Sequence, residues 1–116
     1  MLHDNGQEGV EKTFERVVAI SENDRIVLKA RRVKKKITSL AIIGITNIEG
    51  REHQIVRFDM SHGFLHKDLL FEPKGGKERI FGKIDGKLVE RIINETASEF
   101  EAMKRKYSRK IREGKK

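Results

Sequence analysis

KITSLAIIGITNI, from Lys36 to Ile48, is the most apolar stretch of this 116-residue chain and decides its fold class. Its apolar residues occupy both alternating faces of an extended segment: Leu40, Ile42, Ile43 and Ile45. This pattern is typical of a strand that is covered on both sides or nearly so. We therefore expect residues 36–48 to lie at the centre of a β-sheet.

Further strands are predicted on both sides of this segment. TFERVVAI alone fits a helix or a strand, but the polar SEND and the β-branched RIVLKARRV that follow it favour a hairpin. Turn residues separate the later alternating segments, at Gly50, at Gly63 and in EPKGGK. The expected strands cover residues 13–20, 25–33, 36–48, 53–60, 65–71 and 78–84, an antiparallel meander of five or six strands.

Helical spacing replaces the alternation after Asp85, which is placed to cap a helix over residues 86–112. Seven residues step by three or four positions along it: Val89, Ile93, Thr96, Phe100, Met103, Tyr107 and Ile111. Such a helix is roughly 40 Å long, so its basic end is expected to project toward nucleic acid or a second copy of the chain. The predicted fold class is α+β, with a flexible tail at 1–11 and one domain at 12–116.

Composition limits the classes of function. The chain has no cysteine, which excludes disulfides, a thiolate nucleophile and a sulfur-ligated zinc site. No apolar run approaches the roughly 20 residues that span a bilayer, and MLHDNGQEGVEK lacks the features of a signal peptide. We expect a cytoplasmic protein without a membrane partner, whose Lys, Arg, Glu and Ile usage resembles that of thermophilic proteins.

The net charge of +8 is unevenly distributed. Two clusters are predicted to bind nucleic acid: Lys29, Arg31, Arg32, Lys34, Lys35 and Lys36 in the first, and Lys104, Arg105, Lys106, Arg109 and Lys110 in the second, which continues with Arg112, Lys115 and Lys116. A polarised basic surface favours a polyanion such as RNA or DNA. Alternatively, the second cluster complements the helix dipole and aids solubility.

RFDMSHGFLHKD, from Arg57 to Asp68, concentrates groups suited to acid–base chemistry. If Val56 and Phe58 share the core face with Leu69 and Phe71, the predicted catalytic residues share the other face, with His62 at the turn. These residues are Arg57, Asp59, His62, His66 and Asp68. The plainer interpretation is an ion-pair patch at a polar turn.

An RNA substrate would give each of these groups a role. One histidine takes the proton of a 2′-hydroxyl and the other protonates the leaving 5′-oxygen. Arg57 or Lys67 stabilises phosphate charge, and Asp59 or Asp68 orients an imidazole. The same residue types suit a metal ion, but His62 and His66 flank a turn and are not on one helix face, so metal binding is the weaker hypothesis.

Other motifs are absent from the sequence. It contains no P-loop, GxGxxG, GxSxG or HExxH pattern, so no cofactor is expected. Most of the six Phe residues are assigned to the core, and stacking of bases on an aromatic platform is not expected.

The stretch VRFDMSHGFLHKDLLF resembles the TumE-like proteins, toxins of toxin–antitoxin modules, at Arg57, Phe58, Asp59, His62 and His66. Met60 stands where that pattern has asparagine. The resemblance implies a small metal-independent ribonuclease paired with an antitoxin. The alternative function is a non-enzymatic protein that binds nucleic acid or a partner, with a homodimer through the C-terminal helix.

Overall fold

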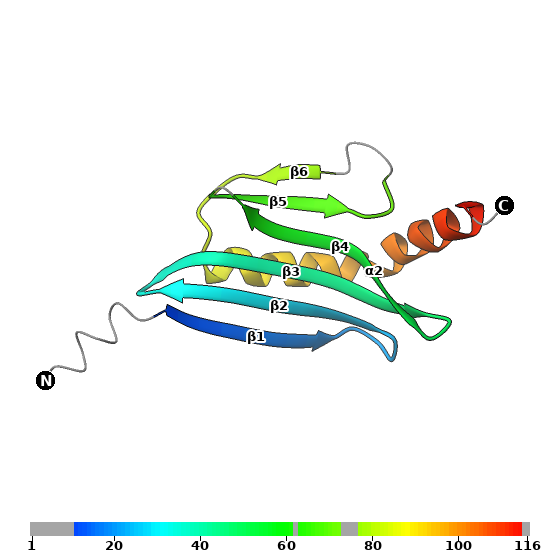
Figure 1. The fold of residues 1–116 in the computed structure, drawn as a ribbon, viewed down its shortest axis with the longest axis horizontal. Helices are drawn as coiled ribbons and strands as arrows, with labels where there is room; N and C mark the ends of the chain where they lie inside the picture. Colours follow the sequence, from blue (N-terminus) through cyan, green and yellow to red (C-terminus); the bar gives the residue numbers. More distant parts are fainter. Residues whose placement is uncertain (1–10, 62, 73–76, 115–116) are drawn as a thin grey trace, which may run out of the picture.

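The computed structural model describes residues 11–61, 63–72 and 77–114, which form an α+β fold (Figure 1). Six antiparallel strands pair in the order of the sequence, from β1 to β6, and one long helix follows them. The elements are β1 (Glu11–Ala19), β2 (Asp24–Val33), β3 (Lys36–Ile48), β4 (Arg51–Ser61), β5 (Phe64–Leu69), β6 (Lys77–Ile80) and α2 (Gly86–Gly114).

The predicted meander and C-terminal helix are confirmed. β3 has the bounds of the quoted apolar stretch and lies between β2 and β4. Several boundaries differ from the prediction by one to four residues. In particular, β1 begins at Glu11, inside the expected tail, β5 ends at Leu69, and β6 ends at Ile80 and does not reach residue 84. Among the described residues, no helix is both long and apolar enough to cross a lipid bilayer.

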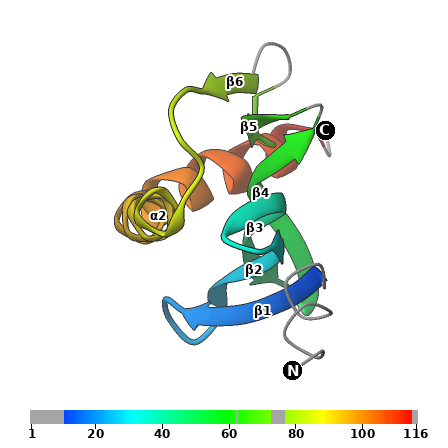
Figure 2. The same cartoon turned by 90° about the vertical axis from the view of Figure 1, so that its left-hand side faces the viewer.

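The sheet and the helix make two layers, with α2 against one face of the sheet (Figure 2). The core between them is built from alternate residues of the strands and from one stripe of the helix. Its members include Ile26, Leu28, Leu40, Ile42, Val56, Phe58 and Leu65 from the sheet, and Leu88, Val89, Ile92, Ile93, Phe100 and Met103 from α2. We call the opposite face, which α2 does not cover, the outer face.

The apolar character of β3 on both faces has two different causes. Leu40 and Ile42 are buried beneath α2, whereas Ile43 and Ile45 are buried on the outer face, each 8% exposed, and are not part of the core cluster. The cross-strand neighbours of Ile43 are Val27 and Arg57, and long side chains such as arginine cover apolar neighbours with their aliphatic parts. Side chains of the neighbouring strands therefore shield the outer-face residues of β3, although no described element packs on that face.

A β-bulge changes the expected alternation of β4. Gly44 pairs with Val56 but Ile45 pairs with Gln54, so Ile55 is an extra residue in β4. A bulge of this kind reverses which face the following residues occupy. Strict alternation along residues 53–60 would predict that His53 and Ile55 share the face of Arg57, and the bulge makes this prediction wrong. Ile55 joins the core, and the His53 Nδ1 lies 3.0 Å from the hydroxyl of Tyr107 on α2.

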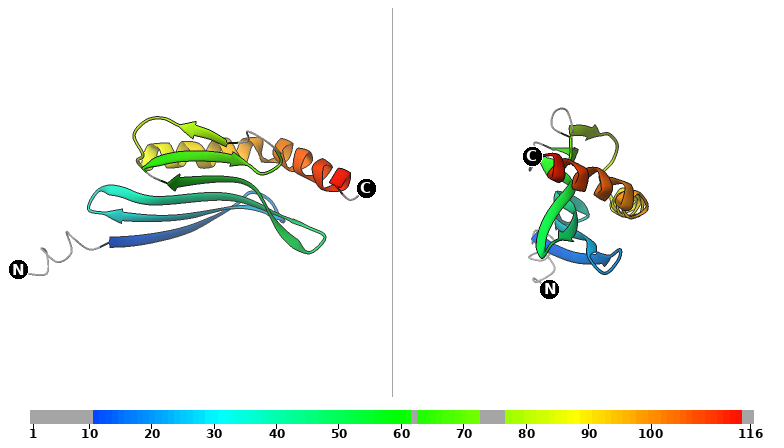
Figure 3. Two further views of the ribbon diagram at one scale, coloured as in Figure 1. Left: turned by 45° about the horizontal axis from the view of Figure 1, so that its top comes forward. Right: turned by 90° about the vertical axis from the view of Figure 1, so that its right-hand side faces the viewer.

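The last turns of α2 are only partly packed. Tyr107 contacts the core and His53, while Ile111 is half-buried beside Ile48 and Glu49 of the β3–β4 hairpin. The end of the helix and this hairpin extend past β5 and β6 in the same direction (Figure 3). Much of the apolar stripe is therefore used within the chain, which weakens the argument for a homodimer through α2.

Gly44 permits the close approach of α2 to the sheet. A Cβ atom at this position would lie 2.8 Å from Phe100 Cε1 and 2.8 Å from Val56 Cγ1. Such distances are too short for carbon atoms, and both neighbours are buried. Phe100 therefore packs directly against the backbone of β3.

A buried carboxylate connects the sheet to the helix. Asp24 is 2% exposed and accepts hydrogen bonds from Thr46 Oγ1 at 2.5 Å, Ser21 Oγ at 2.8 Å and Lys104 Nζ at 2.9 Å. Burial acts to raise the pKa of Asp24, but the hydrogen bonds outweigh it, and the pKa lies below its ordinary value of 3.8. The hydrogen bond to Asp24 in turn raises the pKa of Lys104. We call these four residues the Asp24 cluster.

Substitution Gly44→Ala should lower the free energy of unfolding by about 2 kcal/mol, because the added methyl group overpacks a core without space for it. Urea denaturation measures the loss. Gly86→Ala is the matched control, since a Cβ there meets nothing within 4 Å. Equal stabilities of the two variants would contradict the close packing of Phe100 on β3.

Substitution Lys104→Met should cost about 3 kcal/mol, because it leaves the Asp24 carboxylate buried without its counter-charge. The figure is at the low end of the range for buried pairs because the Lys104 side chain is 26% exposed. Lys87→Met, at an exposed position of α2, should change stability by less than about 0.5 kcal/mol. A similar small change for Lys104→Met would show that the pair does not hold the helix to the sheet.

The Asp24 cluster also predicts sensitivity to acid. Because the folded-state pKa of Asp24 is lowered, its stabilising effect is complete above the unfolded-state pKa and is lost as the pH falls below that value toward the folded-state pKa. The free energy of unfolding of Asp24→Asn should therefore fall less between about pH 5 and pH 2 than that of the parent. Denaturant titrations across this range provide the comparison, and parallel curves would contradict it.

Candidate nucleic-acid interface

Cross-strand partners on the outer face form rows that run across the sheet. One row contains, from β1 to β6, Glu15, Lys29, Ala41, Asp59, His66 and Arg79. The next row contains Val17, Val27, Ile43, Arg57, Asp68 and Lys77. Neighbouring strands are about 4.8 Å apart, so Lys29 and Arg79 are separated by roughly 19 Å.

The two rows meet in a cavity of ≈ 170 Å³ between β4, β5 and β6, which we call the β4–β5 pocket. It is lined by Arg57, Asp59, His66, Asp68 and Lys77. Asp59 is the direct partner of His66, and Arg57 is the direct partner of Asp68. The predicted sharing of one face by Arg57, Asp59, His66 and Asp68 is confirmed, and Lys77 joins them from β6.

The charges in the β4–β5 pocket are accessible to solvent. Arg57 Nε lies 3.6 Å from Asp59 Oδ2, with side-chain exposures of 38% and 49%. Exposed ion pairs of this kind contribute at most about 1 kcal/mol. A phosphate group can therefore compete with Asp59 for the guanidinium at little cost.

A second hollow of ≈ 570 Å³ adjoins the β4–β5 pocket, because Arg57 and Asp59 line both. Lys29 and Arg31 line its β2 side, and the small residues Ser39 and Ala41 lie on β3 between them and β4. The two cavities place basic groups from β2 to β6 along one path. We call Lys29, Arg31, Arg57, His66, Lys77 and Arg79 the outer-face track.

Only one of the two predicted catalytic histidines can be placed. His66 lies in the β4–β5 pocket, whereas His62 lies outside the described residues. Lys67, the predicted alternative to Arg57 as a phosphate ligand, is turned toward the other face, where its ammonium lies 5.7 Å from the centre of the Phe58 ring. Lys77 provides the second basic group in its place.

The first basic cluster is divided between two faces and a turn. Lys29 and Arg31 belong to the outer face, and the Arg32 guanidinium lies 5.1 Å from the centre of the Phe14 ring on the helix-covered side. Lys34 and Lys35 form the β2–β3 turn, and Lys36 begins β3. Two of the six predicted phosphate ligands therefore lie on the outer-face track.

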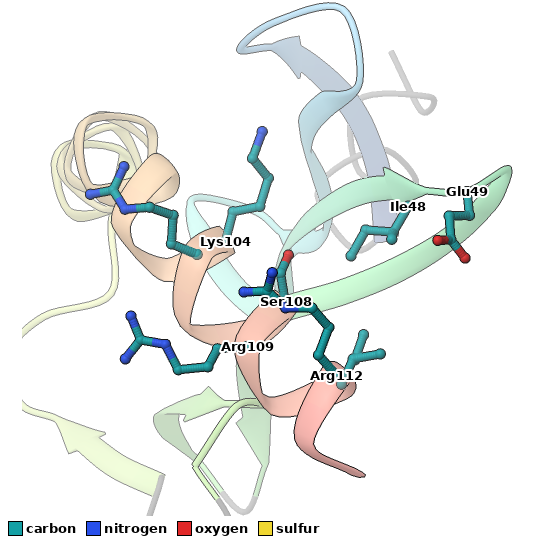
Figure 4. Close-up of a pocket in the computed structure, with 8 residues that line it drawn as sticks. Ile48, Glu49, Lys104, Ser108, Arg109 and Arg112 are labelled. Carbon is teal, nitrogen blue, oxygen red and sulfur yellow. The ribbon is translucent and has the colours of Figure 1, made fainter. Parts of the chain in front are cut away.

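The second basic cluster lies along the end of α2. Arg105, Ser108, Arg109 and Arg112 line a cavity of ≈ 320 Å³ with Ile48 and Glu49 of the β3–β4 hairpin. Lys104 also lines it, but its ammonium bonds to Asp24, and Figure 4 shows Lys104 and Arg109 extending in different directions. Lys104 thus has a structural partner that its neighbours on α2 do not share.

The structure does not join this second cluster to the β4–β5 pocket. The Lys106 ammonium lies 5.8 Å from the centre of the Phe71 ring, and Lys110 Nζ donates to the carbonyl of Leu70 at 3.5 Å. Arg105, Lys106, Arg109 and Lys110 line neither outer-face cavity. Their predicted binding of nucleic acid therefore concerns a separate surface.

Sequence reasoning missed four residues around the β4–β5 pocket: Phe64, Lys77, Arg79 and Phe81. Lys77 and Arg79 alternate within β6, and pairing of β6 with β5 brings them beside Asp68 and His66. Extending the alternation used for β4 and β5 into ERIFGKI would have indicated Arg79, but the register with β5 was needed to place either residue.

No group of three or more His, Cys, Asp or Glu residues is placed to hold a metal ion within residues 11–61, 63–72 and 77–114. Two acidic residues and His66 do line the β4–β5 pocket, but together with two basic residues. The geometry thus offers no described site for the metal-binding alternative.

Comparison with protein families gives one match. The family model described as domain of unknown function DUF7718 matches residues 9–116, which include every described strand and the helix. No curated protein and no solved structure matches the chain.

Proposed function

We propose that the chain, which belongs to the DUF7718 family, binds RNA on its outer face and cleaves it without a metal ion. The observation that carries the proposal is the β4–β5 pocket, where an imidazole, two carboxylates and two basic side chains line one small cavity. A solvated ion-pair patch explains Arg57 with Asp59. It does not explain why His66 and Lys77 border the same cavity at the β6 end of a basic path.

The reaction best suited to these groups is transfer of the RNA phosphate to its own 2′-oxygen. The 2′-hydroxyl loses a proton and attacks phosphorus, the bond from phosphorus to the 5′-oxygen breaks, and the departing oxygen gains a proton. The products are a 2′,3′-cyclic phosphate and a 5′-hydroxyl. DNA lacks the nucleophile, so this chemistry selects RNA.

His66 is assigned one of the two proton transfers, since imidazole accepts and donates protons near neutral pH. Asp59, its cross-strand partner, is assigned to orient the ring. His62 is predicted from the sequence to perform the other transfer. The antitoxin partner likewise stays a prediction from the resemblance to TumE-like proteins.

Arg57 and Lys77 are assigned to the phosphate. Preorganised positive groups stabilise the negative charge that develops on the non-bridging oxygens, and losing one such donor commonly reduces the rate by about 10²- to 10³-fold. Lys29 and Arg31 contact phosphates on the β2 side of the same path. Each such contact strengthens binding, and this contribution to the affinity falls as the salt concentration rises.

The decisive experiment is cleavage of a labelled RNA in EDTA by the parent protein and by His66→Ala. The substitution should slow cleavage by about 10²- to 10⁴-fold, the usual contribution of a proton-transfer group, without a change in melting temperature. Arg57→Gln and Lys77→Gln should each reduce the rate as well. A 2′,3′-cyclic phosphate on the product would identify the reaction.

His53→Asn is the matched control, because His53 is an imidazole on the opposite face, bonded to Tyr107. It should leave the rate unchanged. Cleavage by the parent that His66→Ala does not slow would place the chemistry elsewhere. Salt-sensitive RNA binding with no cleavage by any variant would favour the alternative function, a binding protein without catalysis.

A further inference from the structure

We infer that Phe64, Arg79 and Phe81 form a stacking site for an unpaired base beside the β4–β5 pocket, so that the RNA ligand is single-stranded. The inference rests on the proposed function and specifies its substrate class. It also reverses the expectation from sequence that no aromatic residue is available for stacking. Phe64 and Phe81 are 43% and 74% exposed.

The rings of Phe64 and Phe81 both lie against the guanidinium of Arg79. Arg79 Cζ lies 3.6 Å from the centre of the Phe64 ring and 4.9 Å from the centre of the Phe81 ring. Stacking of a planar guanidinium on aromatic rings is favourable and fixes the rings at the surface. Arg79 therefore supplies both the positive charge and the support for two exposed rings.

Strand pairing places this group directly next to the proposed chemistry. Arg79 is the cross-strand partner of His66, and Leu65 pairs with Ile80. Continuing the same register sets Phe64 opposite Phe81. Phe64 is two residues from His66 on one face of β5, a separation of roughly 7 Å, so a phosphate at His66 and the base of an adjoining nucleotide can be bound together.

The exposure of Phe81 fits a role in ligand binding better than a role in core packing. A large apolar ring left in water contributes little to folding, whereas an aromatic platform beside basic groups binds bases of any identity. The charge of the surroundings complements a polyanion, since Arg57, Lys77 and Arg79 are neighbours on the outer face. Stacking of one base is worth enough to change affinity about tenfold or more.

Stacking requires a base that is free of its helix. In double-stranded RNA the bases are paired and stacked on one another, and proteins contact mainly the backbone and the minor groove. A duplex can therefore use the basic groups of the outer-face track but not the rings of Phe64 and Phe81. The site predicts a preference for single strands that depends on these rings.

Binding of a 2′-O-methyl oligonucleotide tests the site separately from cleavage, because this strand lacks the free 2′-hydroxyl that would attack phosphorus. Fluorescence anisotropy should give at least tenfold tighter binding of the single strand than of its duplex to the parent protein. Phe81→Leu and Phe64→Leu should each weaken binding of the single strand about tenfold and leave duplex binding unchanged.

Tyr107→Leu is the control for the loss of an aromatic ring. Tyr107 lies on α2, where it packs against the core and His53 on the side of the sheet opposite the β4–β5 pocket, and it lines neither outer-face cavity. It should bind both probes as the parent does. All variants are compared at equal salt, with thermal melting to confirm that they are folded.

Phe81→Trp gives a direct report of stacking, since the chain contains no tryptophan. Saturation with the single strand should strongly quench the fluorescence of the introduced tryptophan, while saturation with the duplex should have little effect. Equal affinity of the parent for both probes, or equal losses in the Tyr107 and Phe81 variants, would overturn the inference.

The outcomes also separate this inference from the proposed function. Cleavage that depends on His66 with no effect of Phe64 or Phe81 refutes the stacking site alone. Ring-dependent binding of single strands without cleavage refutes the catalytic proposal alone. If the parent binds neither probe at low salt, both are refuted.

Discussion

Within the part of the chain that the structure describes, one helix, α2, packs on a sheet of six strands, and it can cover only one face. α2 and the inward residues of the strands complete the core on that side, and no other described element packs on the outer face. An antiparallel sheet tolerates this arrangement because its two faces can differ in polarity. The consequence is a broad surface on which side chains from all six strands are displayed in register.

The Asp24 cluster and Gly44 decide how the helix lies on the sheet. Lys104 bonds to a carboxylate that is almost fully buried, and Phe100 packs where β3 has no side chain. The first contact depends on charge and joins α2 to β2, and the second depends on close approach and joins α2 to β3. They hold α2 over the face opposite the β4–β5 pocket, so the residues assigned to RNA are free of the core.

The basic residues form two separate surfaces, so the net charge of +8 does not belong to one continuous binding surface. The outer-face track crosses the strands from β2 to β6, whereas Arg105, Arg109 and Arg112 surround a cavity at the end of α2. RNA bound as we propose would follow the rows of cross-strand partners. The helix end offers a second place for a polyanion, and part of its charge already has a structural role through Lys104.

The sequence by itself determined the α+β class, the order of the strands, the helix and the common face of Arg57, Asp59, His66 and Asp68. Periodicity is sufficient for these features, because residues two apart in a strand share a face and residues three or four apart share one side of a helix. The tertiary structure alone decided the position of His53, because one extra residue at Ile55 reverses the alternation. It alone brought Lys77 into the β4–β5 pocket, and Arg79 and Phe81 beside it, because pairing between β5 and β6 depends on a register that periodicity does not specify.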